Sequence, residues 1–344
     1  MSNSWNNNGT VRNSRNSREG AKKRRLEDAY ENAKKVIQRL KEAIEEIEDD
    51  GKQGVAEVEL LLDHLSDLTT LDVSADGKMV IVASYNDIWI IDNEHYTMKP
   101  MKVDGNLIFA LKFIPGKPLA VAAVGGALML VNLEKGEPLN YLGPANRQVL
   151  QIAVSRDGRT VIAGQTNGCV TSWDLANTKE NWSRIVFAGG THMLAITDDQ
   201  QHVWCGSCCY TVYKLDMKNG DVIRAVETAG RVLSLAAVPR TNNVVVRHAS
   251  MFEIVGDCKY EIARCANSKA SDNICVTNGG DILLVSAGNL IHAFYMDNLK
   301  KPASVYSGHT AEVISIVIMP DDEHFVSSGE DGTVRLWKLQ KRGG

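Results

Sequence analysis

The sequence lacks the features that would place the protein in a membrane or on nucleic acid. No apolar run approaches the roughly 18 residues needed to cross a bilayer. A net charge of −4 at pH 7 gives no general attraction for nucleic acid. The Asn- and Ser-rich start, with its scattered arginines, is unlike a secretory signal. We therefore expect an intracellular protein with no membrane span and no direct nucleic-acid binding by its folded part.

Motifs that carry chemistry are also scarce. No Gly-rich phosphate cradle, paired-carboxylate site or metal-ligand cluster stands out, and aromatic residues make up only 6% of the chain. The seven cysteines lie in apolar stretches, which suits a reducing compartment. Cys205 and Cys208 have C-x-x-C spacing, but no second ligand pair suits zinc, and the surrounding pattern favours a buried strand. We expect no metal, no cofactor and no catalytic residue.

The first fifty residues divide into two zones. Residues 1–19 form an Asn-, Ser- and Arg-rich tail that cannot bury a core, so disorder is expected. Residues 20–50 carry apolar residues spaced alternately by four and three, which predicts a coiled-coil helix. Gly51 ends this helix, and residues 51–57 form a linker. The predicted helix-pairing residues are Leu26, Tyr30, Ala33, Ile37, Leu40, Ile44 and Ile47.

The apolar stripe of this helix needs a partner. Pairing with another helix is favoured over docking on the same chain, because the heptad spacing is strict. Self-association is one arrangement, since an antiparallel copy would set the basic start against the acidic end, and a different helix is the other. The basic run at residues 22–25 also resembles a nuclear-localisation patch, with a solvated helix start as the alternative.

From residue 58 to residue 340 the chain reads as a repeat of short alternating strands. "LTTLDVSADGKMVIVAS" (68–84) and "ISIVIMPDDEHFVSSG" (314–329) each show an apolar strand, a polar turn and a second apolar strand. The unit recurs every 39 to 42 residues, and its anchors are Leu71, Leu111, Ile152, Leu194, Leu235, Ile274 and Ile316. Seven units of this length predict an all-β, seven-bladed β-propeller, followed by a tail at 341–344.

Two units carry motifs that resemble the WD (tryptophan–aspartate) repeat family. The third contains "TNGCVTSWDL" (166–175), with the Trp–Asp dipeptide itself. The last contains a Gly–His pair at 308–309, followed by "SSGEDGTVRLWKL" (327–339). In both, an Asn or Asp stands six residues before the tryptophan. The other units keep only the strand pattern. The spacing of the repeat therefore extends over the whole region, whereas the sequence motif is present in only two blades.

The resemblance implies a buried hydrogen-bonded relay that ties one blade together, made by a histidine, a serine, an aspartate and a tryptophan. A catalytic Ser–His–Asp triad is the alternative interpretation, and it would need an exposed serine and an oxyanion hole. The residues that take the relay positions are His309, Ser327 or Ser328, Asp331 and Trp337 in the last blade, and Asn167 and Trp173 in the third.

The repeat also predicts how the ring closes. The segment "GVAEVELLL" (54–62) precedes the first complete unit, while the last unit ends one strand short. We therefore expect the early strand to pair with the last blade and so remove two open sheet edges.

The resemblance implies a non-enzymatic platform whose upper face binds partner peptides around a central channel. The residue four positions before each anchor should lie near that rim, although an ordinary loop role is the alternative for each. The candidate rim residues are Asp67, Asn106, Arg147, Gln148, Arg231 and Glu312.

We thus expect a scaffold or adaptor subunit of an intracellular complex that recruits protein partners through the helix and the propeller. The basic run favours a nuclear complex, for RNA processing, export or transcription, over a cytoplasmic one. One alternative is a signalling subunit similar to G-protein β subunits, which share a helix before a propeller. An alternative of another class is an enzyme with a site in the propeller channel.

Overall fold

The computed structural model describes residues 57–60, 65, 67–92, 97–103, 107–142, 148–249, 251–256, 260–264 and 273–341. The predicted tail at 1–19 and helix at 20–50 lie outside the described residues. So do the rim candidates Asn106 and Arg147. The same holds for the predicted helix-pairing residues Leu26, Tyr30, Ala33, Ile37, Leu40, Ile44 and Ile47.

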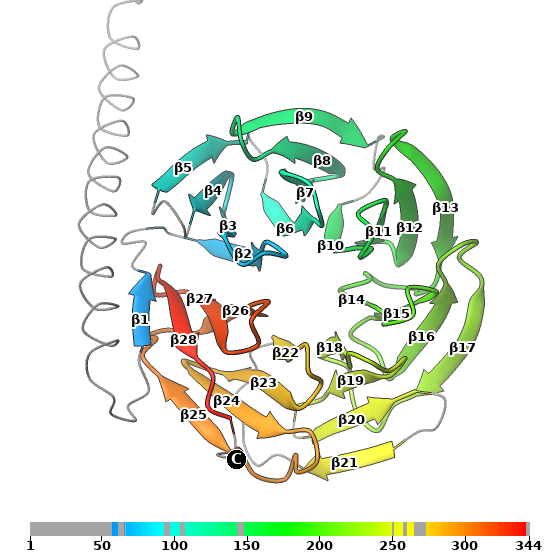
Figure 1. Cartoon of the computed structure of the whole chain (residues 1–344). Coiled ribbons are helices and arrows are strands. Elements are labelled where there is room, and N and C mark those ends of the chain that lie inside the picture. Colours follow the sequence, from blue (N-terminus) through cyan, green and yellow to red (C-terminus); the bar gives the residue numbers. More distant parts are fainter. Residues whose placement is uncertain are drawn as a thin grey trace, which may run out of the picture.

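Within the described part of the chain, seven four-stranded antiparallel sheets stand as blades around a central axis (Figure 1). Blade 1 comprises β2 (Leu68–Val73), β3 (Met79–Ser84), β4 (Asp87–Asp92) and β5 (Thr97–Lys102). Blade 2 comprises β6 (Ile108–Ile114), β7 (Leu119–Val124), β8 (Ala127–Asn132) and β9 (Glu137–Leu142). Blade 3 comprises β10 (Val149–Val154), β11 (Thr160–Gln165), β12 (Cys169–Asp174) and β13 (Lys179–Ile185). The predicted all-β, seven-bladed propeller is confirmed.

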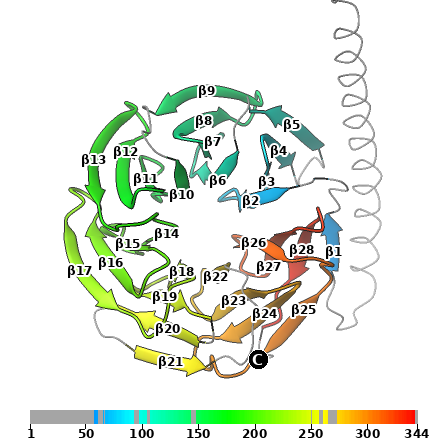
Figure 2. The same ribbon diagram turned by 180° about the vertical axis from the view of Figure 1, so that it is seen from behind.

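The remaining blades follow in chain order, and the view from behind shows their first strands lining the axis (Figure 2). Blade 4 comprises β14 (Met193–Ile196), β15 (His202–Gly206), β16 (Thr211–Asp216) and β17 (Val222–Glu227). Blade 5 comprises β18 (Ser234–Ala237), β19 (Val244–Arg247), β20 (Met251–Val255) and β21 (Tyr260–Arg264). Blade 6 comprises β22 (Ile274–Val276), β23 (Ile282–Ala287), β24 (Leu290–Tyr295) and β25 (Ser304–Ser307). Blade 7 comprises β26 (Val313–Ile318), β27 (His324–Gly329), β28 (Val334–Lys338) and β1 (Glu57–Leu60).

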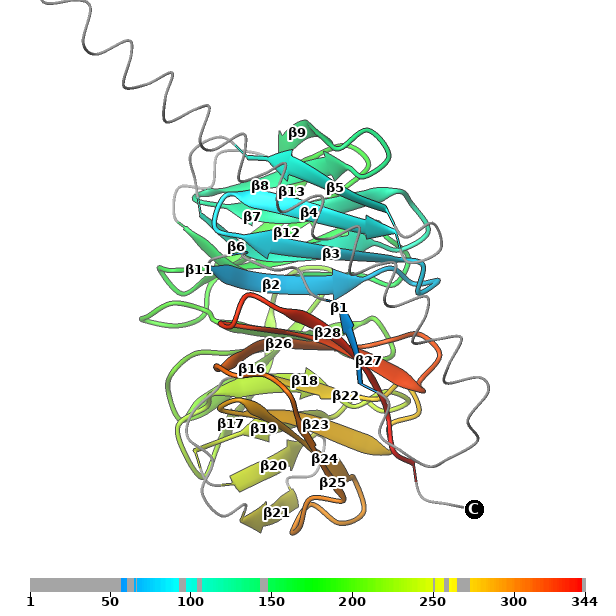
Figure 3. The ribbon, with the colours of Figure 1, turned by 90° about the vertical axis from the view of Figure 1, so that its left-hand side faces the viewer.

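Blade 7 is the only blade built from two distant parts of the described chain. Strand β1 pairs antiparallel with β28, from Glu57 opposite Trp337 to Leu60 opposite Val334. The side view shows the two strands next to each other (Figure 3). The predicted closure by an early strand is therefore confirmed, and the pairing joins the two ends of the ring.

The hydrophobic core lies between adjacent blades. Second strands such as β7 (LAVAAV) are buried along almost their whole length, because both faces pack against neighbouring blades. Outer strands such as β9 (EPLNYL) are mostly exposed, because only one edge of each meets another strand of its blade. Between blades 1 and 2, Ile81, Phe113 and Met129 share one buried cluster. Packing of this kind fixes the seven blades relative to one another and holds their loops in place at the rims.

Candidate functional site

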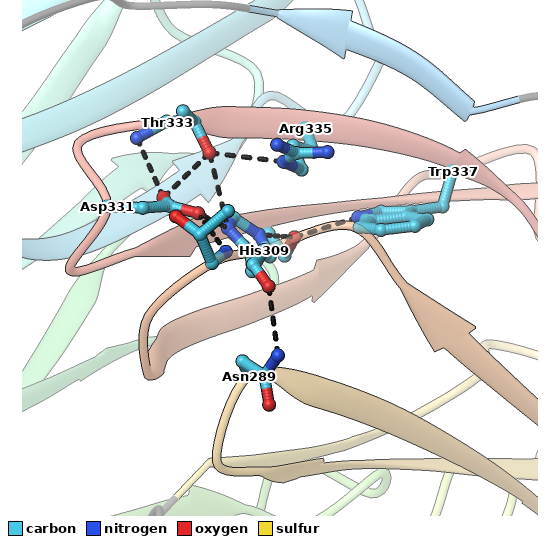
Figure 4. Close-up of polar contacts among 8 residues, drawn as sticks. Asn289, His309, Asp331, Thr333, Arg335 and Trp337 are labelled. Carbon is cyan, nitrogen blue, oxygen red and sulfur yellow. Dashed lines mark hydrogen bonds and ion pairs between the residues drawn. The ribbon is translucent and has the colours of Figure 1, made fainter.

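A buried relay runs through blade 7 (Figure 4). The Trp337 Nε1–H donates to Ser327 Oγ at 2.8 Å, and Ser327 Oγ lies 2.7 Å from His309 Nε2. On the other side of the imidazole, His309 Nδ1 lies 2.9 Å from Asp331 Oδ2. A neutral imidazole protonated on Nδ1 satisfies the whole chain, because Ser327 then donates to Nε2 and Nδ1–H donates to the carboxylate. The structure thus brings together His309, Ser327, Asp331 and Trp337.

The charges in this relay follow from burial and hydrogen bonding. Burial lowers the pKa of His309 below its ordinary 6.5, and the neighbouring Asp331 carboxylate opposes this shift without cancelling it. Burial tends to raise the pKa of Asp331, but hydrogen bonds from the Thr333 hydroxyl and the Thr310 backbone outweigh that effect. The pKa of this carboxyl is therefore below its ordinary 3.8. The relay holds a neutral histidine beside an ionised aspartate.

Thr333 is a member of the relay that the sequence reading missed. Its hydroxyl donates to Asp331 Oδ1 at 2.7 Å and accepts from Arg335 Nε at 3.1 Å. Asn289, between β23 and β24 of blade 6, donates through Nδ2 to the carbonyl of His309 at 3.1 Å. The sequence signal for Thr333 was its position, since it is a hydroxyl residue two positions after Asp331 of the turn. The contacts of Thr333 hold the relay within blade 7, and the contact of Asn289 joins it to blade 6.

Ser327 and Ser328 have different environments. Both are fully buried, and Ser327 lies in the relay. Ser328 Oγ has no hydrogen-bond partner among the described residues. Ser327 already accepts a hydrogen bond from Trp337 and is closed off from solvent, so its hydroxyl cannot reach a substrate. The arrangement is that of a structural clamp and lacks the exposed nucleophile of a triad.

In blade 3 the residues that match the motif make separate local contacts. Asn167 Oδ1 accepts from the backbone N–H of Cys169 at 3.1 Å, which closes the turn before β12. The Trp173 Nε1–H donates to Thr171 Oγ1 at 3.2 Å, within the same strand. The structure therefore does not join Asn167 and Trp173 in one relay, and the tryptophan is held chiefly by its packing against blade 2.

Blade 5 contains a buried charged pair that the sequence reading missed. Glu253 is fully buried, and its Oε2 lies 3.0 Å from His248 Nε2, while Oε1 accepts from Ala229 N at 3.1 Å. His248 Nδ1 lies 3.1 Å from the carbonyl oxygen of Arg231. The sequence signals were a His directly after an apolar strand and a Glu within "MFEIV" (251–255). The pair supports the loop at 229–231, which leads into β18.

The neighbours of this imidazole differ from those of His309 in blade 7. His248 lies between the Glu253 carboxylate and the backbone carbonyl of Arg231. His309 lies between the Asp331 carboxylate and the Ser327 hydroxyl. Blade 5 therefore ties its histidine to a backbone loop, and blade 7 ties its histidine to side chains.

Several rim candidates occupy equivalent backbone positions. The carbonyls of Asp67, Gln148 and Glu312 accept hydrogen bonds from the N–H groups of the loops between second and third strands, at 2.9, 2.9 and 2.8 Å. The donors are Tyr85, Thr166 and Glu330. We call the face formed by these loops, and by the loops that enter each innermost strand, the upper rim. Arg231 enters β18 on the same face, with its carbonyl held by His248.

A cavity of about 870 Å³ lies on the axis and is lined by the first strands of all seven blades. Lys112 lines it from β6 and forms a 2.7 Å ion pair with Asp72 of β2. Asp72 also accepts from the backbone N–H of Phe113 at 2.9 Å, which fastens blade 1 to blade 2. The lining reaches His192 and Arg231 at the upper rim. The cavity therefore extends to this face of the propeller.

The C-x-x-C segment is only partly a buried strand. Cys205 lies in β15, and burial raises the pKa of its thiol far above the ordinary range. Strand β15 ends at Gly206, however, so Cys208 is exposed in the following turn, which corrects the prediction for that residue. In the described ranges no group of three or more His, Cys, Asp or Glu side chains could hold a metal ion. Over the same ranges, we find no helix of the length and apolarity that a bilayer crossing requires.

Comparison with known proteins agrees with this geometry. The family model described as "WD domain, G-beta repeat" matches residues 300–338. This stretch contains the relay of blade 7. Residues 300–338 are therefore similar to a WD repeat. Proteins built on WD-repeat propellers are generally protein-interaction scaffolds.

Three relatives illustrate how the similarity is distributed. The chain is 21% identical over 299 residues to the WD repeat-containing protein 26 homolog of Arabidopsis thaliana, a match that covers 82% of this chain and 50% of that protein. It is 31% identical over 97 residues to the E3 ubiquitin-protein ligase COP1 of Pisum sativum, covering 25% and 14%. It is 38% identical over 63 residues to the cilia- and flagella-associated protein 57 of Mus musculus, covering 18% and 5%. The chain thus spans half or less of the length of these relatives.

Proposed function

We propose that the protein is a non-enzymatic scaffold or adaptor subunit of a multiprotein complex, and that it binds partner peptides on its upper rim. The observation that supports the proposal is the equivalent backbone position of Asp67, Gln148 and Glu312 in three blades, on the face where the lining of the axial cavity reaches Arg231. Loops from separate blades there offer polar side chains to one extended ligand. The buried relay supports the same conclusion, because the histidine and serine that could perform chemistry instead hold strands together.

We further propose that residues 20–50 form a second attachment point, through helix pairing at Ile37, Leu40 and Ile44. This part of the proposal rests on the strict heptad spacing of the sequence. A nuclear complex is favoured because of the basic run at 22–25. Replacing those four residues by Ala should move a fluorescently tagged protein from the nucleus to the cytoplasm, and unchanged nuclear accumulation would remove the basis for the nuclear assignment.

Affinity purification read by mass spectrometry tests the two attachment points separately. Three variants of the full chain are compared with the wild type. The rim variant replaces Asp67, Gln148 and Arg231 by Ala, and the helix variant replaces Ile37, Leu40 and Ile44 by Ser. The control replaces Lys117 and Lys218 by Ala, because both are exposed in loops that follow the other ends of the strands.

The rim variant should lose one set of partners, the helix variant another, and the control none. If the helix variant alone loses a single small subunit, the plan of a G-protein-β-like protein is favoured. If the rim variant retains every partner of the wild type, the propeller rim is not the docking surface and the proposal fails.

A further inference from the structure

The axial cavity is lined by basic side chains, although the chain as a whole is slightly acidic. Lys112, Arg156, His192 and Arg231 line it, and its described lining residues include no Asp or Glu. The chain has 42 acidic residues against 38 Lys and Arg, so composition alone does not explain a lining of one sign. The other polar groups of the lining are amides, hydroxyls and thiols. The ionisable Lys, Arg and His side chains of the lining are thus all basic, although two of them have carboxylate partners just outside it.

The basic residues of the lining have different environments. Lys112 is ion-paired with Asp72 at 2.7 Å, and Arg156 is ion-paired with Asp198 at 2.6 Å. His192 and Arg231 enter the first strands of blades 4 and 5 and lie together at the upper rim. Both side chains line the same cavity. Burial lowers the pKa of His192, and the positive charge of Arg231 lowers it further. An anion placed between them would interact favourably with both.

The backbone holds these two residues in place. The N–H of His192 donates to the carbonyl of Gly206 at 3.2 Å, and the N–H of Val232 donates to the carbonyl of Cys209 at 2.9 Å. The carbonyl of Arg231 accepts from His248, which is itself bound to Glu253. The loops at 189–192, 207–210 and 229–232 are thus fixed relative to β15 and to the core of blade 5. Such a prepared site loses little conformational entropy on binding.

An exposed aromatic residue lies in the loop between β15 and β16, on the same face. Tyr210 is 63% exposed, and its carbonyl accepts from the N–H of Thr228 at 2.8 Å, in the loop that leads to Arg231. Tyrosine and arginine are the residue types that most often dominate binding energy at protein interfaces. We call His192, Tyr210 and Arg231 the basic sector of the upper rim.

We propose that the basic sector binds an acidic side chain, either a carboxylate or a phosphorylated residue, of an extended partner peptide. This inference rests on the proposed function, because it names the chemistry of the peptide that the rim receives. Blades 4 and 5 lie across the axis from blade 1 (Figure 1), where Asp67 marks the rim, with Glu312 in the adjacent blade 7. The opposite signs of the two sides direct the acidic residue of the peptide towards blades 4 and 5.

Selection from a random peptide library on the immobilised full-length protein tests this inference. Displayed 12-residue peptides are enriched on the wild type and on the Arg231→Glu, His192→Glu and Lys218→Glu variants. Lys218→Glu is the matched control, because it makes the same reversal of charge at an exposed residue on the opposite face of the propeller. Enriched peptides are then synthesised with Glu, with Gln and with phosphoserine at the selected acidic position. Their dissociation constants are measured by fluorescence anisotropy.

Peptides selected on the wild type should be enriched in Asp and Glu at one position, and changing that residue to Gln should weaken binding about 10-fold or more. Arg231→Glu should abolish this preference, while Lys218→Glu keeps it. A phosphoserine peptide that binds more tightly than its Glu counterpart identifies a phosphorylated partner, and weaker binding identifies a carboxylate. Arg231→Glu and His192→Glu must retain the wild-type melting temperature for the comparison to hold.

Two outcomes overturn the inference and are distinguishable. If peptides are enriched without any acidic preference, or if Arg231→Glu and His192→Glu both keep the same acidic motif, the basic sector is not the recognition element, although the rim still binds peptides. If no peptide is enriched on any variant, the proposed peptide-binding function fails together with the inference.

Discussion

Blades 7 and 5 each bury a histidine against a carboxylate, but the second ring nitrogen of each histidine has a different neighbour. In blade 7, neutral His309 donates to an ionised Asp331, which is stabilised by hydrogen bonds from Thr310 and Thr333. Its other ring nitrogen faces the Ser327 hydroxyl. In blade 5, His248 lies between the Glu253 carboxylate and the backbone carbonyl of Arg231. Blade 7 therefore joins side chains of one blade into a network, whereas blade 5 holds the backbone of a loop. The same pair of residue types thus gives two kinds of structural clamp.

The largest effect is expected when the blade 7 relay loses its tryptophan. Trp337 is 1% exposed and stacks on Phe325 with a centroid distance of 5.9 Å. Trp337→Ala should lower the free energy of unfolding by about 3 to 5 kcal/mol, because a large buried aromatic is removed and leaves a cavity. Urea unfolding followed by circular dichroism measures the change. A loss below about 1 kcal/mol would show that blade 7 does not depend on this packing.

The motif-based reading found blade 7 because its residues stand at fixed spacings along the chain. His309, Asp331 and Trp337 were predicted together from the resemblance, and the structure places all three in one network. The choice between Ser327 and Ser328 could not be made from the sequence. Adjacent residues of a strand point to opposite faces, and both faces of β27 are buried, so composition gives no preference. Only the strand register decides it.

Blade 5 was missed for a different physical reason. Its histidine follows β19 and its glutamate lies within β20, a local arrangement with no recognised spacing. A Glu in a short alternating strand reads as a solvent-facing residue, whereas Glu253 is fully buried. The fold class and the number of blades were predictable, because hydrophobic period and turn residues repeat seven times. The basic sector of the rim was only partly predictable, since Arg231 was found by position and His192 and Tyr210 were not.

The second largest effect is expected when the blade 5 pair loses its carboxylate. Glu253→Ala should destabilise the protein by about 3 kcal/mol, because one partner of a buried charged pair is removed and Ala229 N–H loses its acceptor. Glu253→Gln should cost less, since the amide oxygen still accepts from Ala229. Thermal unfolding of both variants measures the difference. Equal destabilisation by Ala and Gln would mean that the charge, and not the hydrogen bond to the loop, controls the stability of this blade.

A smaller effect is expected in the pH dependence of stability, to which His309 of blade 7 should contribute. The pKa of His309 in the folded protein lies below its ordinary 6.5, so below about pH 6.5 the unfolded chain binds a proton that the folded chain does not. The stabilisation is fully present above pH 6.5 and is lost as the pH falls towards the folded pKa. Melting temperatures from pH 7.5 to 5.0 should therefore fall less steeply in His309→Gln than in the wild type.

The difference between those two curves isolates His309, because His192 and His292, whose pKa values are also lowered by burial, are present in both proteins. Parallel curves would show that His309 binds protons equally well in the folded and unfolded states. In that case burial would not hold His309 neutral in the relay.

The smallest effect is the expected difference in stability between variants of the two motif tryptophans, Trp337 and Trp173. Trp337 donates to fully buried Ser327 at 2.8 Å, whereas Trp173 donates to Thr171 in its own strand at 3.2 Å. Replacing either by Phe keeps an aromatic ring and removes one N–H donor, so the loss of ring volume is similar in both. Trp337→Phe should therefore lower the free energy of unfolding by about 0.5 to 1 kcal/mol more than Trp173→Phe does, which is roughly the net value of one buried hydrogen bond. Chemical unfolding of the two variants side by side measures this difference. If Trp173→Phe is the more damaging, then the tryptophan of blade 3 has a role beyond its local hydrogen bond, and the relay geometry does not explain why blade 7 needs its indole nitrogen.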